Sequence, residues 1–201
     1  MTGRIVLLNG APRSGKSSIA RAMLAQTDRL WLNFGVDAFM AITPAHLQPG
    51  IGLRPGGERP DLEPTIRQLY GTLFDTLAAM ARSAHVVSDL GIHDGYSSPL
   101  GILPDAVRRL SGLPVLFVGV HCPIETIMAR RNADPQGGYY AAGDTVPEPV
   151  RRWQDAVHLP GIYDLELDTS QSTPEQCVDA IMRRLADWPT PTAFERLARR
   201  T

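Results

Sequence analysis

The stretch GAPRSGKS, residues 10–17, constrains the fold of this chain more than any other part of it. It matches the pattern G-x-x-x-x-G-K-[ST] and lies between two runs of opposite periodicity. Residues 4–10 (RIVLLNG) are typical of a buried strand, and residues 15–26 (GKSSIARAMLAQ) of an amphipathic helix. Glycines let such a loop turn its N–H groups inward, and the following helix N-terminus attracts anions. The sequence therefore predicts a phosphate-binding loop (P-loop).

The residues of this loop are the first candidates for nucleotide binding. Lys16 can reach the terminal phosphates of ATP, and the hydroxyl of Ser17 can ligate Mg²⁺. The alternative is a glycine-rich turn with a surface lysine, and the complete motif in register argues against it. We expect nucleotide contacts from Gly10, Ala11, Pro12, Arg13, Ser14, Gly15, Lys16, Ser17 and Ser18.

The rest of the chain alternates strand-like and helix-like runs. Four further strands are predicted at residues 30–36, 85–91, 114–122 and 163–169. Helical patterns cover residues 62–84, 104–112, 123–132 and 173–188. This alternation predicts an α/β fold, a P-loop NTPase three-layer sandwich with a mostly parallel five-stranded sheet. Ligands of such sheets collect at the carboxyl ends of the strands.

The organisation along the chain is that of a single domain. We expect one P-loop domain over residues 1–187 and a C-terminal tail at residues 188–201, which is short and basic. The segment at about residues 132–147 is rich in glycine and proline and is placed like a lid over a nucleotide.

The composition excludes several classes of partner. The 20 basic and 21 acidic residues give a net charge of −1, so nucleic acid and anionic membranes are not expected partners. No run approaches the roughly 20 apolar residues of a membrane span. Cys122 and Cys177 are isolated, and the first apolar run is too short for a secretory leader, so we expect a cytoplasmic protein. The oligomeric state stays open, a homo-oligomer included.

Asp37 is the only carboxylate in the apolar stretch LWLNFGVDAFM, residues 30–40. It follows a predicted strand, whose carboxyl end should face the phosphates, so Asp37 can accept or orient the proton of an attacking alcohol. An apolar surround would increase its basicity. One alternative is that Asp37 only caps a short helix. Another is a ribose-binding acid about 20 residues after the last glycine, but the loop lacks G-x-G-x-x-G.

Asp89 lies near the end of the third predicted strand, and His93 follows that strand. A strand-terminal acid such as Asp89 is placed to hold Mg²⁺, directly or through water, or alternatively to bond the substrate or cap a turn. His93 lies in a loop that would flank the acceptor, although a lone loop histidine is more often simply solvated.

Four segments carry a family resemblance: IVLLNGAPRSGKSSIAR, WLNFGVDAFM, VLFVGVHC and YDLELDT. From about residue 4 to about residue 185 the chain resembles the chloramphenicol 3-O-phosphotransferase family, small P-loop kinases related to shikimate and nucleoside monophosphate kinases. The resemblance implies ATP, Mg²⁺ and transfer of the γ-phosphate to a hydroxyl of a small molecule. In that family the aspartate of FGVD is the proposed general base, which places the role on Asp37. Phe34, in the same motif, could offer a stacking surface for an aromatic acceptor, with core packing as the alternative role.

The resemblance also points to arginines of the lid. The family's lid resembles R-E-x-x-R-G-D-R, whereas this chain has RRNADPQGG. Arg130 fits the first arginine, and the second has no counterpart. Arg131 could replace it, or could simply lie on the surface of a helix. Thr169 lies in the loop that lines the adenine in related kinases.

Three functions remain in contention. The first is a kinase for a neutral or weakly charged small molecule such as chloramphenicol or a related antibiotic. The second is a metabolic kinase for a sugar, nucleoside or polyol, which would use the same catalytic residues. The third is a nucleotide-dependent switch or nucleic-acid-binding module, which the net charge and the lack of a basic stripe disfavour.

Overall fold

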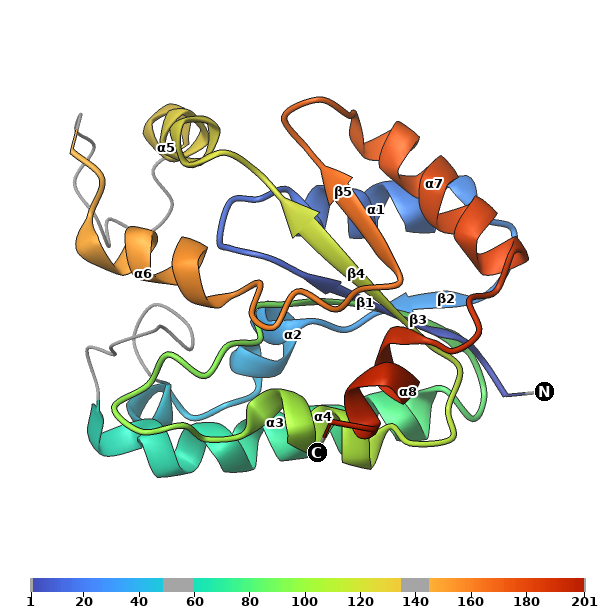
Figure 1. The fold of residues 1–201 in the computed structure, drawn as a ribbon, viewed down its shortest axis with the longest axis horizontal. Coiled ribbons are helices and arrows are strands. Elements are labelled where there is room, and N and C mark those ends of the chain that lie inside the picture. Colours follow the sequence, from blue (N-terminus) through green and yellow to red (C-terminus); the bar gives the residue numbers. More distant parts are fainter. Residues whose placement is uncertain (1, 49–59, 135–144, 201) are drawn as a thin grey trace.

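The computed structural model describes residues 2–48, 60–134 and 145–200, and its centre is a five-stranded sheet (Figure 1). All neighbouring strands pair in parallel, in the order β2-β3-β1-β4-β5. The strands are β1 (Ile5–Asn9), β2 (Trp31–Asn33), β3 (His85–Leu90), β4 (Val115–His121) and β5 (Leu165–Asp168). The predicted α/β sandwich with a parallel five-stranded sheet is confirmed.

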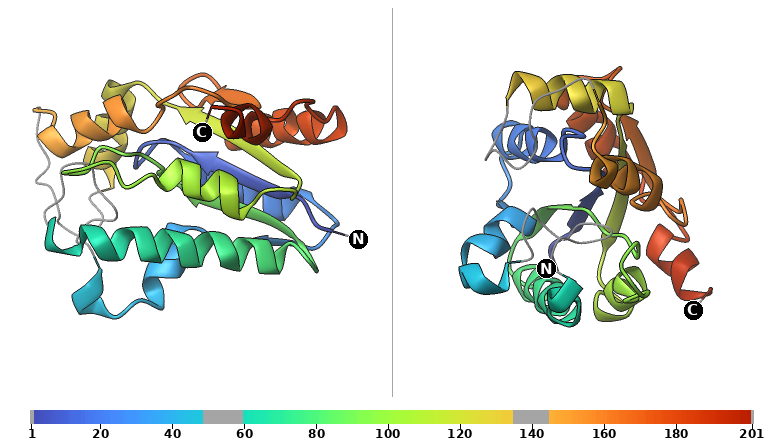
Figure 2. Two further views of the ribbon diagram at one scale, coloured as in Figure 1. Left: turned by 60° about the horizontal axis from the view of Figure 1, so that its bottom comes forward. Right: turned by 90° about the vertical axis from the view of Figure 1, so that its left-hand side faces the viewer.

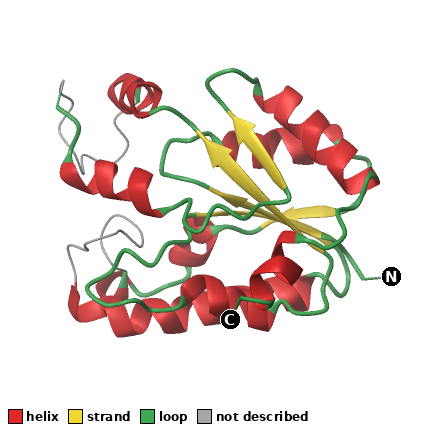
Figure 3. Cartoon of the chain, in the orientation of Figure 1, coloured by secondary structure: helices red, strands yellow, loops and turns green. Residues whose placement is uncertain are grey.

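Helices cover both faces of the sheet (Figures 2 and 3). The α-helices are α1 (Lys16–Gln26), α2 (Val36–Ala41), α3 (Glu63–Met80), α4 (Ile102–Arg109), α5 (Ile124–Ala133), α6 (Glu148–Ala156), α7 (Pro174–Ala186) and α8 (Ala193–Ala198). Short 3₁₀ turns lie at Ala45–Leu47 and Pro60–Leu62. Helices α3, α4 and α8 pack on one face, and α1 and α7 on the other. In the described part of the chain, no helix is both long and apolar enough to span a bilayer.

Strand β1 lies at the middle of the sheet and is buried on both faces. Ile5 and Leu7 face the core beneath α3 and α4, whereas Val6 and Leu8 face the core beneath α1 and α7. A central parallel strand has no solvent face, so its sequence is a continuous apolar run rather than an alternating one. This position brings the P-loop that follows it to the middle of the carboxyl edge.

One predicted strand was too long, and one helix was not predicted. The second strand ends at Asn33 rather than at residue 36, because Gly35 forms the N-cap of α2, which starts at Val36. Helix α6 was not predicted at all, since the prolines around its start suggested a loop. Proline is compatible with the first turn of a helix, where its missing N–H leaves no bond unmade. The N-cap of α7 is Thr173, the first residue of the predicted helical pattern at 173–188, and it forms a full capping box with Gln176.

The C-terminal tail is joined to the core through α8. Phe194 is buried, and its ring lies 5.4 Å from that of Phe117 in β4. The buried carboxylate of Asp164 accepts the N–H of Phe117 at 2.9 Å and the N–H of Ala193 at 2.5 Å. The apolar side of the basic tail is therefore buried against the sheet rather than solvated. The domain boundary at residue 187 stays a prediction.

Candidate active site

The P-loop turns tightly between β1 and α1. Gly15 has φ of 98° and Arg13 has φ of 68°, both in the left-handed region. A Cβ atom on Gly10 would lie 2.4 Å from the carbonyl oxygen of Val120 in β4, so only glycine fits there. Glycine is therefore needed at the two positions of the motif for different reasons. At Gly10 the strand β4 comes too close for a side chain, and at Gly15 the backbone is left-handed.

Lys16 begins α1 and reaches back across the loop. Its ammonium group donates to the carbonyl of Ala11 at 2.8 Å. Burial lowers the pKa of Lys16 to about 8, against the opposing attraction of Asp89 and Asp37. The lysine and the two predicted acids thus share one electrostatic environment, although they come from three separate segments.

Ser17 and Asp89 meet at the carboxyl edge of the sheet. The hydroxyl of Ser17 donates to Oδ2 of Asp89 at 2.5 Å. A Cβ atom on Gly35 would lie only 1.7 Å from Oδ1 of the same carboxylate, so the turn before α2 is packed directly on Asp89. A hydroxyl and a carboxylate are hard oxygen donors of the kind that Mg²⁺ takes, and the pair fits that ion. In the described residues no group of three or more His, Cys, Asp and Glu could hold a metal.

Asp37 lies in the first turn of α2 and is exposed. The helix is capped by Gly35, without a side-chain cap, so the alternative that Asp37 serves as the N-cap is wrong. The expected apolar surround is absent as well, because solvent reaches the carboxylate in this structure. Its negative charge still acts on Lys16, where it opposes the lowering of the pKa of Lys16 by burial.

Arg130 and Thr169 hold the other side of the loop. Nη1 of Arg130 donates to the carbonyl of Arg13 and to Oγ1 of Thr169, both at 3.1 Å, and Nη2 donates to the carbonyl of Thr169 at 2.7 Å. The hydroxyl of Thr169 donates to the carbonyl of Ser14 at 2.6 Å. One guanidinium group thereby joins α5, the P-loop and the loop after β5.

The lid prediction lies partly outside the described residues. Residues 135–144 are not described, and only the flanks of the segment are visible. At its start, Nη1 of Arg13 forms an ion pair with Asp134 at 3.1 Å. Burial and the nearby charge of Arg13 lower the pKa of Arg131. Arg131 therefore lies beside the loop, and its role as the second lid arginine stays a prediction.

The remaining loop residues differ in exposure. Ala11 and Ser14 are buried, Pro12 is exposed, and the N–H of Ser18 donates to the carbonyl of Gly15 at 3.1 Å. The buried hydroxyl of Ser14 has no bonding partner among the described residues.

His93 and Phe34 are packed into the protein. His93 is 3% exposed, and its ring lies 4.4 Å from that of Tyr96 and 4.8 Å from that of Trp153 in α6. The interpretation of His93 as a solvated loop histidine is therefore wrong. Phe34 packs edge-on against Phe39 at 6.3 Å. Neither side chain lies among the P-loop contacts described above.

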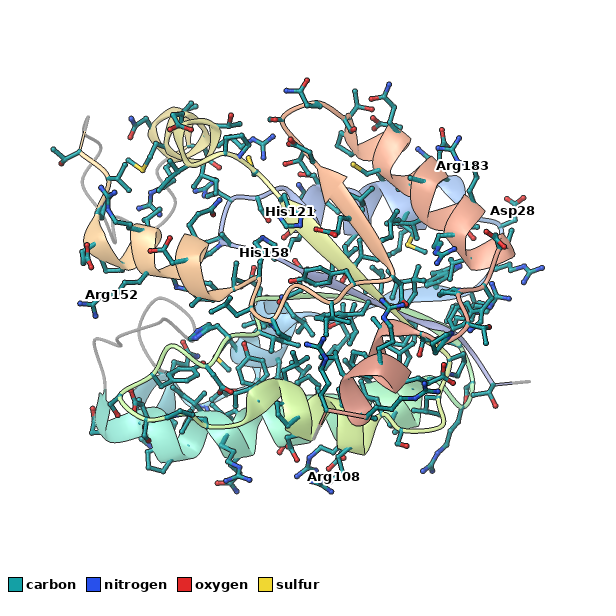
Figure 4. All side chains as sticks on the ribbon, in the orientation of Figure 1. Asp28, Arg108, His121, Arg152, His158 and Arg183 are labelled. Atoms are coloured by element: carbon teal, nitrogen blue, oxygen red, sulfur yellow. The ribbon has the colours of Figure 1, made fainter. Side chains whose placement is uncertain are left out.

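Several residues near the strand ends were not identified as site candidates from the sequence. His121, at the end of β4, stacks on His158 with ring centroids 3.9 Å apart (Figure 4). Burial, together with the nearby His121 and Lys16, lowers the pKa of His158 to about 4. Asn9 and Tyr163 bond to each other at 3.0 Å beside this pair. The one available signal was Asn9, a polar residue at the end of an apolar strand and directly before the P-loop.

Solved structures with a similar fold include two kinases. The APS kinase CysC of Mycobacterium tuberculosis, in complex with AMPPNP and APS, aligns with a TM-score of 0.64 at 16% identity, over 92% of this chain and 98% of that chain. Shikimate kinase of Acinetobacter baumannii, in complex with shikimate, aligns with a TM-score of 0.61 at 15% identity, over 93% and 94%. At such identities the likeness concerns the fold.

The sequence has relatives over its whole length. A Mycobacterium tuberculosis protein that is provisionally named an O-phosphotransferase is 27% identical over 208 residues, which cover 98% of this chain and 89% of the relative. The family model described as chloramphenicol phosphotransferase-like protein matches residues 3–186. That match spans both the P-loop and the FGVD segment, so the chain belongs to the chloramphenicol phosphotransferase-like family.

Proposed function

We propose that this protein transfers the γ-phosphate of ATP, with Mg²⁺, to a hydroxyl group of a small molecule. The observation that carries the proposal is the contact between Ser17 and Asp89 beside Lys16, at the start of α1. A phosphate cradle, a cation and a pair of hard oxygen donors at one strand edge are the parts that phosphoryl transfer needs.

Lys16 and the N–H groups of the loop would bind the β- and γ-phosphates. The Lys16 ammonium group would then bond phosphate oxygens in place of the carbonyl of Ala11. The negative charge of the phosphates would keep the lysine protonated. Arg130 already bonds the P-loop and the loop after β5, so it would act at the periphery of the phosphates and hold these two loops together.

Ser17 and Asp89 would hold Mg²⁺ together with oxygens of the nucleotide and water. When bound, the ion neutralises charge on the phosphates. When the ion binds, Asp89 would lose the hydrogen bond that it accepts from the Ser17 hydroxyl. Its carboxylate would contact the ion instead, directly or through a water.

Asp37 would accept the proton of the attacking hydroxyl. Its position in the first turn of α2, within the electrostatic reach of Lys16, supports this role. An acceptor that covers Asp37 would remove solvent from a carboxylate that is exposed in this structure, and desolvation makes such a group more basic.

The acceptor we propose is neutral or weakly charged, such as chloramphenicol or a related antibiotic. Membership of the family supports this choice. An acidic acceptor of the shikimate type would call for clustered arginines, and the candidates, Arg54 and Arg59, lie outside the described residues. A sugar, nucleoside or polyol remains the second candidate on the same catalytic residues.

The test is ADP release in the presence of a panel of antibiotics and metabolites, with mass spectrometry of the products. We expect Lys16→Ala to abolish transfer and Asp37→Asn to lower kcat by about 10²- to 10⁴-fold, the usual contribution of a positioned base. Unchanged turnover in Asp37→Asn, with Lys16→Ala inactive, would refute the base assignment alone. The absence of any phosphorylated product with the wild-type protein would refute the proposed function.

A further inference from the structure

Asn9, the last residue of β1, uses its whole carboxamide to bond three separate segments. Its Oδ1 accepts the N–H of Ile92 at 2.6 Å. Its Nδ2 donates to the carbonyl of Val157 at 2.8 Å and to the hydroxyl of Tyr163 at 3.0 Å. The side chain is 2% exposed, so none of these bonds competes with water.

The three partners come from segments on different sides of the P-loop. Ile92 follows Asp89 by three residues, in the segment that leaves β3. Val157 directly follows α6, and Tyr163 precedes β5. Because the next residue after Asn9 is Gly10, one amide joins the entrance of the phosphate cradle to the segment that carries the candidate metal-binding acid.

Helix α6 is seated on the strand ends near this amide. A Cβ atom on Gly91 would lie 2.2 Å from Cζ3 of Trp153, so the indole packs directly on the backbone after β3. Gln154 donates to the carbonyl of Cys122, after β4, at 2.8 Å. The hydrogen bond from Asn9 to Val157 attaches the C-terminal end of α6 to the end of β1.

Tyr163 is held on the sheet and completes the network. A Cβ atom on Gly119 would lie 2.7 Å from its ring, and the ring of Phe117 is 4.8 Å away. The Tyr163 oxygen lies 2.9 Å from Nδ1 of His158. Asn9 donates to that oxygen, and the phenol itself donates to the carbonyl of Val157 at 3.4 Å, so the hydroxyl contacts two of the segments that Asn9 joins.

We propose that Asn9 is a positioning residue for phosphoryl transfer, which keeps the P-loop in register with the segment after Asp89 and with α6. The inference rests on the proposed function. The N–H groups of the loop bind phosphate without Asn9, but the distance from the phosphates to the acceptor side depends on segments that this one side chain joins. The competing explanation is a structural one, in which Asn9 only satisfies buried backbone groups.

The two explanations differ in what Asn9→Ala does to folded protein. For a positioning residue we expect kcat to fall by about 10- to 100-fold, since misplacement of about 1 Å costs about 10²-fold. The KM for ATP should stay within about threefold, because the cradle itself is unchanged. Tyr163→Phe removes one of the three bonds and keeps the ring, so a smaller loss of kcat is expected.

The matched control is Asp164→Ala. This carboxylate is also buried and also joins separate segments, through the N–H groups of Phe117 and Ala193. It lies before β5 and bonds α8 rather than the P-loop. We expect Asp164→Ala to lower the midpoint of thermal unfolding while the kcat of the folded enzyme stays within about twofold of wild type.

Hydrogen exchange supplies a readout that needs no acceptor. With Mg²⁺ and a non-hydrolysable ATP analogue, wild-type peptides covering residues 90–95 and 152–158 should gain protection together with the P-loop. In Asn9→Ala the gain should be confined to the P-loop, and in Tyr163→Phe it should be reduced at 152–158. If Asn9→Ala does not fold, Tyr163→Phe carries both measurements.

Each outcome decides one question. Transfer by wild type with kcat unchanged in Asn9→Ala, or in Tyr163→Phe where only that variant folds, would refute the positioning role and leave the proposed function intact. Full protection of both peptides in the variant would refute it as well. Analogue binding by wild type without transfer to any hydroxyl would refute the proposed function, and the exchange data would still decide whether Asn9 couples the segments.

Discussion

Gly35→Ala is the perturbation that most directly probes the candidate metal-binding pair. The backbone at Gly35 is nearly extended, with φ of −109° and ψ of −169°, so alanine meets no left-handed strain there. The difficulty is space: the new Cβ atom would lie 1.7 Å from Oδ1 and 2.8 Å from both Cγ and the carbonyl oxygen of Asp89. The substitution therefore acts through Asp89.

The size of the effect follows from this distance. Ordinary van der Waals contact begins near 3.4 Å, so the carboxylate or the turn before α2 must move by about 1.7 Å. A shift of that size breaks the 2.5 Å bond from Ser17 to Asp89 and separates the two oxygen donors. Because misplacement by about 1 Å costs about 10²-fold, we expect kcat/KM to fall by at least about 10²-fold.

The assay is ADP release as a function of Mg²⁺ concentration at saturating acceptor. We expect the Mg²⁺ concentration at half-maximal activity to rise in Gly35→Ala, because the two donors no longer converge. Gly112→Ala is the control: Gly112 has φ of 74° and nothing within 4 Å of a Cβ, so it should lose about 1 kcal/mol of stability without a change in Mg²⁺ dependence. Wild-type activity and Mg²⁺ dependence in Gly35→Ala would refute the reasoning.

Two further predictions concern Lys16 and α8. Burial lowers the pKa of Lys16 to about 8, so its ammonium form is lost as pH rises through 8. The affinity for ATP, measured by calorimetry, should therefore weaken from pH 7 to pH 9. An affinity that does not change over this range would contradict the prediction. Lys16→Arg should flatten the profile, because guanidinium stays charged. Phe194→Ala should lower the free energy of unfolding by about 3–5 kcal/mol, measured in urea, since the buried ring leaves a cavity beside Phe117; a loss below about 1 kcal/mol would mean that α8 contributes little to the core.

The P-loop and the order of the elements could be predicted because their physical causes are local. A left-handed turn favours glycine, a buried central strand needs an apolar run, and the helix begins at the lysine, directly after Gly15. The same reasoning identified Asp89, since a residue at a strand end must lie at the ligand edge of a parallel sheet. In the structure Asp89 lies at that edge and accepts a hydrogen bond from Ser17.

Predictions that depended on neighbours distant in sequence were less accurate. The apolar residues around Asp37 suggested an enclosed carboxylate, yet α2 turns those side chains toward the core and leaves Asp37 exposed. His93 seemed a solvated loop residue because Trp153, 60 positions later, cannot be seen to cover it. Helix α6 was not predicted because the prolines at its start suggested a loop, whereas they lie at the N-cap and in the first turn of the helix.

The sequence by itself determined the phosphate cradle, the parallel α/β sandwich and the acids available at the strand ends, because each follows from periodicity, glycine conformation or motif spacing. Only the tertiary structure decided which side chains meet. The burial of Asn9 among Ile92, Val157 and Tyr163, the packing of Gly35 on Asp89 and the seating of α8 on Phe117 are contacts between segments far apart in the chain. Such contacts depend on how the helices pack on the sheet, and no local pattern records that packing.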